Sequence, residues 1–257
     1  MSRIFQINKK IFPFTKKIKI SGDKSLSIRW VLLASQAVGK SRAYNLLMSQ
    51  DVLSAIDSIK KLGIKVKITD NYCEIYGNGI NGFKYKKNLQ LNAKNSGTLA
   101  RLILGLLIKS PLKVKLIGDN SLSKRDFLRV TLPLEKFGAK FYYKKKGRLP
   151  LSILGSKSVK GINYFENKGS AQCKSSVMLA ALSASGTTSI KAKKSRNHSE
   201  LLFKYLKIPI KVKITKKYDF IDIKPPKKIP AFNYQIPGDI SSSAFFMALT
   251  TLANDSI

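Results

Sequence analysis

The sequence repeats one local pattern about every 70 to 75 residues. At each recurrence, a turn rich in small polar residues leads directly into the start of an apolar helix. The four recurrences are Ser21–Arg29, Asn95–Arg101, Gly169–Ser175 and Pro237–Ser243. A period of this length indicates a repeated supersecondary unit, and such a unit cannot bury its apolar face alone. The chain is therefore expected to fold by packing several copies of one unit around a shared core.

Each unit is expected to hold two helices and several strands in the same order. The first, apolar helix is predicted over Trp30–Ala37, Leu99–Ile108 and Val177–Ala184. The strand after it is predicted over Ser41–Leu46, Leu112–Ile117 and Thr188–Ala192. A second, amphipathic helix is predicted over Asp51–Leu62, Arg125–Phe137 and Asn197–Leu206. Two strands close each unit, within residues 64–76, 140–154 and 208–223. The unit is therefore predicted to be βαβαββ.

These repeats predict an α/β fold in which three units pack around a common helical core. Residues 21–235 are expected to form this first domain. Residues 236–257 are expected to begin a fourth unit. This unit is the incomplete start of a second domain. The strand-like segment over residues 1–20 precedes the first unit, and we assign it to the second domain.

The amino-acid composition disfavours several classes of protein. No apolar run reaches the roughly 18 residues that a membrane span needs, and the N-terminal segment lacks the apolar block of a signal peptide. Two cysteines and one histidine are too few for a disulfide framework or a structural zinc site, so we expect no metal and a reducing cytoplasm. The net charge of +34 raises the alternative of nucleic-acid binding. That alternative is disfavoured because the lysines are scattered over every segment instead of forming one stripe with aromatic residues.

Polar and cationic side chains recur where the helices begin. Helix N-termini and hydroxyl groups, combined with lysine or arginine, suit a strongly anionic ligand. The candidates are Lys24, Ser25, Arg29, Asn95, Gly97, Arg125, Ser170, Gln172, Ser195, Arg196 and His198. Each of them alone has a plainer interpretation, as a helix cap or an exposed base. Their recurrence at equivalent ends of the units favours one shared site, because those ends converge if the units pack about a pseudo-threefold axis.

Six stretches, in order along residues 21–246, resemble the motifs of one enzyme family. They are Gly22–Arg29, which resembles a GDKSxSxR signature, and Asn95–Arg101, Gly118–Arg125, Ser170–Ser175, Ser195–Glu200 and Pro237–Ser242. The family is that of the 3-phosphoshikimate 1-carboxyvinyltransferases, or EPSP synthases, transferases of the shikimate pathway to chorismate and the aromatic amino acids. The resemblance implies an inside-out α/β barrel with three units in each of two domains. This chain is then three βαβαββ units and the start of a fourth.

The resemblance also implies a reaction and the residues that serve it. The 5-hydroxyl of shikimate 3-phosphate attacks phosphoenolpyruvate and phosphate leaves, with no metal or organic cofactor. The implied ligands of shikimate 3-phosphate are Lys24, Ser25, Arg29, Ser170, Gln172, Ser195 and Arg196. The implied ligands of phosphoenolpyruvate are Lys24, Asn95, Gly97, Arg125 and Gln172. The inhibitor glyphosate occupies the phosphoenolpyruvate site in this family, beside the position of Gly97. We expect a cytoplasmic monomer that binds these small molecules and neither nucleic acid nor membrane.

Two departures from the family pattern bear on activity. Asp126 follows Arg125 where the family usually has proline, and an inward-facing carboxylate there would weaken phosphate binding. The family's main acid and base residues lie in a second domain that 257 residues are too few to include. We therefore expect a chain that is inactive alone, or one half of a split enzyme that needs a separately encoded C-terminal half.

Two alternatives stay open. One is an enzyme like UDP-N-acetylglucosamine 1-carboxyvinyltransferase, which shares the repeat architecture; it is disfavoured because its loop cysteine is missing from Gly118–Arg125. The other is a non-catalytic remnant that still binds shikimate 3-phosphate. Titration with this ligand and with an oligonucleotide separates such binding from nucleic-acid binding, which weakens steeply with salt.

Overall fold

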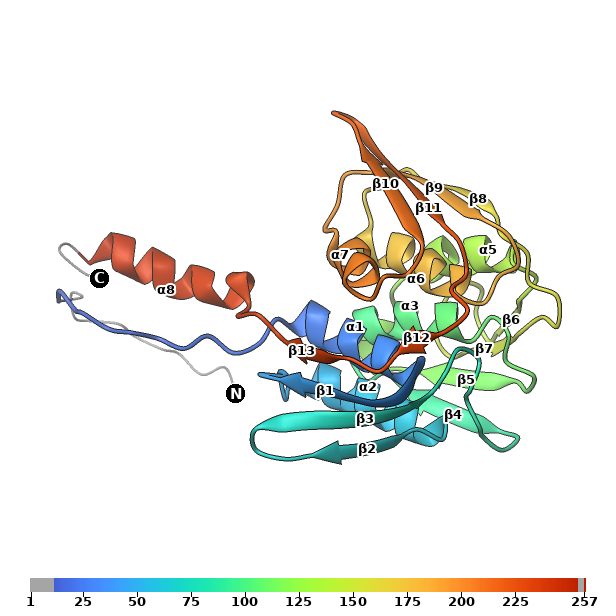
Figure 1. The fold of residues 1–257 in the computed structure, drawn as a ribbon, viewed down its shortest axis with the longest axis horizontal. Helices are drawn as coiled ribbons and strands as arrows, with labels where there is room; N and C mark the ends of the chain where they lie inside the picture. The colour runs from blue at the N-terminus through green and yellow to red at the C-terminus, as the bar shows by residue number, and fades with distance from the viewer. Residues whose placement is uncertain (1–11, 254–256) are drawn as a thin grey trace.

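Three sheets with one common strand order surround a group of helices (Figure 1). The structure, a computed structural model, describes residues 12–253 and residue 257. The first unit contains α1 (Lys24–Ser35), β1 (Ala37–Tyr44), α2 (Gln50–Lys61), β2 (Lys65–Ile68) and β3 (Tyr72–Asn78). The second contains β4 (Leu89–Asn92), α3 (Gly97–Leu106), β5 (Val114–Ile117), α4 (Asn120–Ser123), α5 (Leu128–Glu135), β6 (Lys140–Tyr143) and β7 (Leu151–Leu154). The third contains β8 (Asn163–Glu166), α6 (Ala171–Ala181), β9 (Thr188–Lys193), α7 (His198–Tyr205), β10 (Ile210–Ile214) and β11 (Tyr218–Ile223). The chain then forms β12 (Ile229–Pro230), β13 (Asn233–Gln235) and α8 (Ile240–Leu252). The predicted architecture of three units and the start of a fourth is confirmed.

Each sheet begins with one parallel pair and continues antiparallel. In the second and third sheets the opening strand is local in sequence, because β4 pairs with β5 and β8 pairs with β9. In the first sheet the strand parallel to β1 is supplied by β12 and β13, from far along the chain. The pseudo-threefold arrangement is therefore complete only when residues 229–235 return to the first unit.

The strand expected in the N-terminal segment does not form in its described part. Residues 12–20 carry no helix or strand, and residues 1–11 lie outside the described residues. This segment runs beside α8, where Lys16 N donates to Ile257 O and Ile257 N donates to Phe14 O. It joins the domain at a short antiparallel bridge between Gly22 and Gly238. The division into domains at residue 235 stays a prediction.

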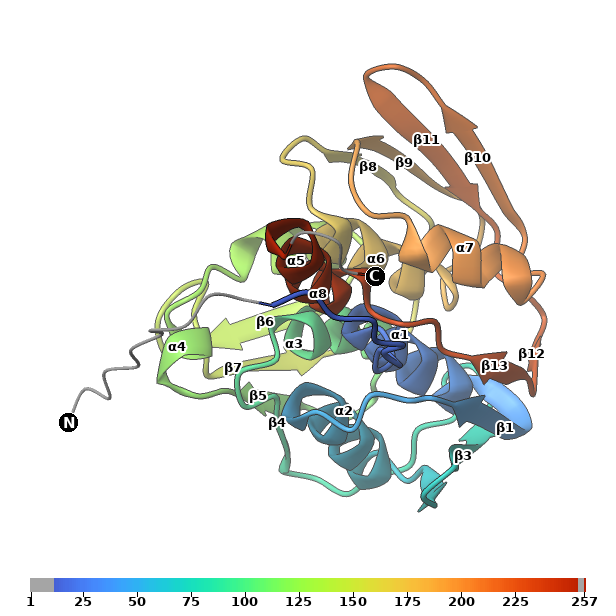
Figure 2. The same ribbon diagram turned by 90° about the vertical axis from the view of Figure 1, so that its left-hand side faces the viewer.

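The helices lie inside and the sheets outside. Figure 2 shows α1, α3 and α6 grouped at the centre, with the three sheets around them. These helices are buried along most of their length, including Trp30, Leu104 and Met178. Gly105 lets α3 approach α6 closely, because a Cβ there would lie 2.2 Å from Ser176 O. This inside-out arrangement leaves the helix ends, and not their sides, free to form a site.

The helix predicted over Arg125–Phe137 is wrong in its first turn. The structure has a short helix, α4, then a turn, and α5 starts only at Leu128. Backbone donors that would continue a helix find other acceptors, because Phe127 N donates to Gly147 O and Leu128 N donates to Asp126 Oδ1. Arg125 therefore lies in a turn between two helices.

The last helix differs from its three counterparts in its surroundings. No residue of α8 is buried, and the Phe245 side chain is 79% exposed. In the described part of the chain, no helix is both long and apolar enough to cross a membrane.

Candidate functional site

The three central helices start at the same end of the core. Each is capped by a side chain of the repeated turn: Asp23 accepts from Leu26 N, Ser96 from Leu99 N and Ser170 from Cys173 N, at 2.7, 3.3 and 3.2 Å. The first turns of α3 and α6 are joined by a hydrogen bond from Gln172 Nε2 to Thr98 Oγ1 of 3.0 Å. Helices α1 and α6 are joined by one from Arg29 Nη2 to Ser175 Oγ, also 3.0 Å. Three positive helix ends thus face one region, as an anion site requires.

Two guanidinium groups flank Gly97 at the start of α3. A Cβ on Gly97 would lie 2.7 Å from Arg101 Nη1 and 3.0 Å from Arg125 Nη1. Arg101 Nη1 also donates to Gln172 Oε1 at 2.9 Å, and Arg125 Nη2 donates to Asn95 Oδ1 at 3.3 Å. The structure therefore brings together four of the predicted phosphoenolpyruvate ligands: Asn95, Gly97, Arg125 and Gln172. Because Gly97 has no side chain, the two guanidinium groups can approach the start of α3 closely.

Arg101 belongs to this cluster although the sequence analysis assigned it no role. Its guanidinium also donates to Gly97 O at 3.2 Å and lies 5.1 Å from the ring centroid of Phe127. Burial lowers the pKa of Arg101, and the neighbouring Arg125 acts in the same direction. The signal that could have found this residue is its place one helical turn after Gly97.

Asp126 is turned toward helix α5. Its Oδ1 accepts from Leu128 N at 2.9 Å, and its backbone carbonyl accepts from Arg101 Nη2 at 3.4 Å. The carboxylate thus serves as a local cap of α5. The described contacts give no ion pair between Asp126 and Arg125.

Lys24 and Ser25 lie at the exposed start of α1. Lys24 Nζ pairs with Asp51 Oδ2 at 3.1 Å, and the lysine side chain is 48% exposed. Its backbone N donates to Asp239 Oδ2 at 3.4 Å, which links α1 to the turn before α8. Ser25 is half-buried. Both side chains stand at the rim of the helix ends, where an incoming anion competes with Asp51 for the ammonium group.

Arg29, in contrast, is buried and already hydrogen-bonded. Its Nε donates to Ser199 Oγ at 2.8 Å, Nη1 to Ser25 O at 3.1 Å and Nη2 to Ser175 Oγ at 3.0 Å. Burial lowers its pKa to about 10, a shift that Glu200 and Asp23 oppose, so the group stays cationic at neutral pH. Arg29 thus joins α1 to α6 and α7, and direct contact with a ligand requires an exchange of these bonds.

A buried ion pair beside Arg29 was not foreseen from the sequence. Lys174 on α6 is fully buried, and its Nζ lies 2.6 Å from Glu200 Oε1 on α7. The geometry leaves Lys174 Nζ and Glu200 Oε2 without hydrogen bonds in the described part of the chain. The one available signal was a lysine inside a helix whose following residues are small or apolar.

The start of α7 contributes three more polar groups. Arg196 Nη2 donates to Ser241 Oγ at 3.3 Å and so reaches the first turn of α8. Ser195 Oγ and His198 Nδ1 are buried atoms without a hydrogen-bond partner among the described residues. Burial lowers the pKa of His198, and the positive charge of Arg29 lowers it further. The imidazole is therefore neutral at pH 7.

Acidic and soft ligands do not gather here. Among residues 12–253 and 257, no group of three His, Cys, Asp or Glu side chains is placed to hold a metal ion. The geometry offers cations, hydroxyls, an amide and helix ends, which is chemistry for binding oxyanions.

Comparison with known proteins agrees with this site chemistry. The family profile of EPSP synthase (3-phosphoshikimate 1-carboxyvinyltransferase) matches residues 9–257. The 3-phosphoshikimate 1-carboxyvinyltransferases of Bacillus subtilis and Streptococcus mutans are each 39% identical to this chain, over 93% of it and 55% of their own length. A solved structure of EPSP synthase from Acinetobacter baumannii matches with a TM-score of 0.85 at 32% identity, covering 96% of this chain and 56% of that one. The chain thus spans about half the length of the curated relatives it matches. By its sequence profile and its fold, the chain belongs to the EPSP synthase family.

Proposed function

We propose that the helix-end site binds shikimate 3-phosphate and phosphoenolpyruvate, and that it forms one half of an enolpyruvyl transfer site. The observation that carries this proposal is the close approach of two guanidinium groups to Gly97 at the start of α3, beside Gln172. Two multiply charged anions must share one site in this reaction, so converging cations and helix ends are the main requirement.

The residues divide between the two ligands by position. Asn95, Gly97 and Arg125 face a phosphoenolpyruvate at the start of α3, with the Arg125 guanidinium on its phosphate. Ser25, Ser170, Ser195 and Arg196 surround shikimate 3-phosphate near α1, α6 and α7. Lys24 and Gln172 stand between the two sets. Arg29 holds α6 and α7 in place, and its buried positive charge stabilises the phosphate of shikimate 3-phosphate.

The chemistry that follows is addition and elimination. The 5-hydroxyl of shikimate 3-phosphate gives up its proton to a base, and its oxygen bonds to carbon 2 of phosphoenolpyruvate as carbon 3 takes up a proton from an acid. Loss of a proton from carbon 3 then expels inorganic phosphate and leaves an enolpyruvyl ether. The described residues supply binding and charge stabilisation. We assign the main proton transfers to the part of full-length relatives that this chain does not span, so turnover needs that part, from the same chain or a separate one. We place the protein in the cytoplasm as a monomer.

Binding of shikimate 3-phosphate to the 257-residue chain tests the site. Calorimetry should detect it in about the millimolar range, since only part of the ligand's surroundings is present. Lys24→Gln should weaken it about tenfold, the loss of one charge-assisted contact. Lys61→Gln is a matched control, because Lys61 is similarly exposed, at 43%, and pairs with Asp57 at 3.0 Å. Equal affinities of the parent chain and the Lys24→Gln variant would show that Lys24 does not bind this ligand.

Phosphate release tests the reaction. The chain alone should not release phosphate from phosphoenolpyruvate in the presence of shikimate 3-phosphate. Addition of the C-terminal half of the Bacillus subtilis relative should restore release, and Arg125→Gln should abolish it. Activity of the chain by itself would contradict the proposed division of labour. Binding without any restored activity would favour a non-catalytic function.

A further inference from the structure

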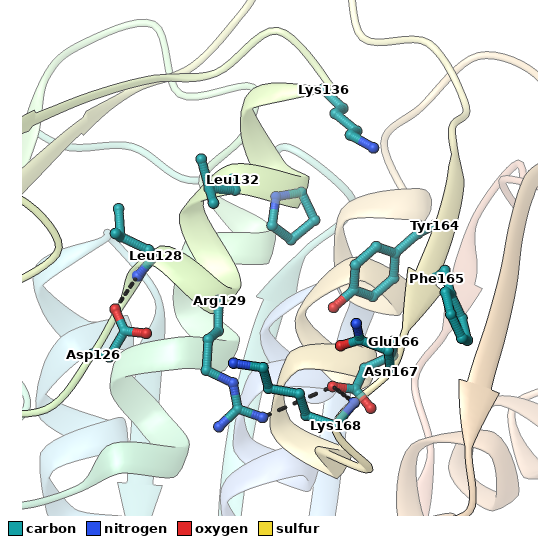
Figure 3. A pocket seen from close by; sticks show the side chains of 11 residues that line it. Asp126, Leu128, Arg129, Leu132, Lys136, Tyr164, Phe165, Glu166, Asn167 and Lys168 are labelled. Atoms are coloured by element: carbon teal, nitrogen blue, oxygen red, sulfur yellow. Dashed lines mark hydrogen bonds and ion pairs between the residues drawn. The ribbon is translucent and has the colours of Figure 1, made fainter.

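The three units meet at three equivalent junctions, where the second helix of one unit faces the opening strand of the next. At the first junction α2 packs on β4. At the third, Tyr205 of α7 lies 5.2 Å from the ring of Tyr234 on β13 and donates a hydrogen bond to Asn233 O at 2.7 Å. At the second junction, between α5 and β8, there is instead a cavity of about 650 Å³ (Figure 3). We call it the junction cavity.

One reason for the cavity is the shortened second helix of the middle unit. Helix α5 has 8 residues, compared with 12 in α2, because its first turn is replaced by the turn around Arg125. Helix α7 is equally short, but an aromatic side chain fills the space beside it. The corresponding space beside α5 is open to solvent and is large enough for a small organic molecule.

Hydrogen-bond donors with no described acceptor line this cavity. The guanidinium of Arg129 makes one long ion pair, with Glu166 Oε1 at 3.9 Å, and no hydrogen bond to another described residue. The Tyr164 hydroxyl likewise has no described partner, and it points from β8 toward α5 (Figure 3). Burial raises the pKa of Tyr164, so its hydroxyl remains a donor at neutral pH. Lys168 adds an ammonium group without a described ion pair.

The carboxylates that line the cavity already accept hydrogen bonds from backbone N–H groups. Glu166 is buried, and its two oxygens accept from Ser170 N at 2.8 Å and Lys168 N at 3.3 Å. Asp126 caps α5 through Leu128 N. The lining contains three cations, Arg129, Lys136 and Lys168, and these two carboxylates, so its net charge is +1. The cationic side chains have fewer polar contacts with the rest of the chain than the carboxylates do.

The remaining wall is apolar. Leu132 and Pro133 of α5 line the cavity on one side, and the ring of Tyr164 on β8 lines it on the other. Phe165 is turned to the opposite face of β8, where its ring centroid lies 5.7 Å from that of Tyr218 (Figure 3). A flat ring packed between α5 and Tyr164 would bury apolar surface, at about 25 cal/mol for each Å².

We propose that the junction cavity is a binding site for a small aromatic carboxylate. Its carboxylate pairs with Arg129, in the two-bond geometry that a guanidinium favours, and accepts from the Tyr164 hydroxyl. Its ring packs between the apolar side chains of α5 and the ring of Tyr164. The site adjoins the helix-end site, since Glu166 accepts from Ser170 N, but none of its binding groups is a residue assigned above to shikimate 3-phosphate or phosphoenolpyruvate.

Titration of the 257-residue chain with sodium benzoate tests this proposal, with binding followed by protein-observed NMR. A fragment of this size should bind with a dissociation constant of about a millimolar. Signals of Arg129, Leu132 and Tyr164 should shift together. Benzamide, which has the ring without the charge, and acetate, which has the charge without the ring, should each bind at least about tenfold more weakly.

Substitutions locate the binding. Arg129→Gln and Tyr164→Phe should both weaken benzoate binding, the first by about tenfold or more. Arg148→Gln is the matched control, because it removes a half-buried guanidinium of the same unit outside the junction cavity. A third variant, Leu132→Glu, places a carboxylate at an exposed position of the apolar wall and should repel the ligand without disturbing the core. Unchanged affinity in Arg129→Gln, or a loss seen with Lys24→Gln instead, would overturn the proposal.

Discussion

The buried pair of Lys174 and Glu200 gives the sharpest test of how the helix-end site is supported. Lys174→Met removes the cation from a site with no solvent contact and leaves the carboxylate of Glu200 buried, with Arg29 as a nearby cation. Breaking a buried pair in this way costs about 3–5 kcal/mol, which is a large part of the roughly 5–15 kcal/mol that stabilises a domain. The melting temperature should fall by roughly 10 °C.

Replacing both partners should cost far less than replacing one. In Lys174→Met with Glu200→Gln, no unpaired charge remains between α6 and α7. The double variant loses the 2.6 Å contact between Lys174 Nζ and Glu200 Oε1 together with both charges, and Glu200 Oε2 has no hydrogen bond to lose in the described structure. We expect the double variant to recover most of the stability that Lys174→Met loses.

Urea unfolding followed by circular dichroism measures these differences. Lys204→Met is the control, because Lys204 is an exposed lysine of α7, and it should change the free energy of unfolding by less than about 0.5 kcal/mol. A Lys174→Met variant as stable as the parent would refute the reasoning. So would a double variant less stable than both single variants, because the pair would then be contributing net stability.

Three further outcomes follow from the same structure. Gly97→Ala should leave the melting temperature nearly unchanged, since only the flexible ends of Arg101 and another arginine must move. In an enzyme reconstituted with a C-terminal half, the same substitution should raise KM for phosphoenolpyruvate about tenfold. An unchanged KM would show that Gly97 does not contact that ligand. His198 is the single histidine, so its imidazole signal can be followed by NMR, and its pKa should lie below 6.5. Because the unfolded chain takes up this proton first, stability should fall as pH decreases below about 6.5, and less so in His198→Gln. Burial raises the pKa of Cys73 to about 12 and also raises that of Cys173, so neither thiol should react with a disulfide reagent at pH 8 until urea is added; fast reaction of the native protein would contradict their burial.

The sequence predicted what depends on local pattern. Helical spacing of apolar residues and glycine-bounded turns located α2 and the closing strands of each unit, and recurrence of the Ser/Gly turns located the helix-end site. Two features were missed because they depend on distant partners. The interrupted helix at Arg125 results from competition by the Gly147 carbonyl. The burial of Arg29 results from hydroxyl groups on two helices more than a hundred residues away.

The return of β12 and β13 to β1 also sets an order for folding during synthesis. The hydrogen bond from Phe232 N to Ser41 Oγ spans 191 positions, whereas the opening strands of the other two sheets lie close to their partners. At about 5–20 residues per second, the ribosome needs roughly 10–40 s to deliver that strand after β1 has emerged. The second and third sheets can form in this interval. Meanwhile one edge of β1 has no paired strand, so it can form hydrogen bonds with non-native strands. A codon context that slows translation before residue 235 would lengthen this exposure, so the first unit is where nascent chains of this protein should most need a chaperone.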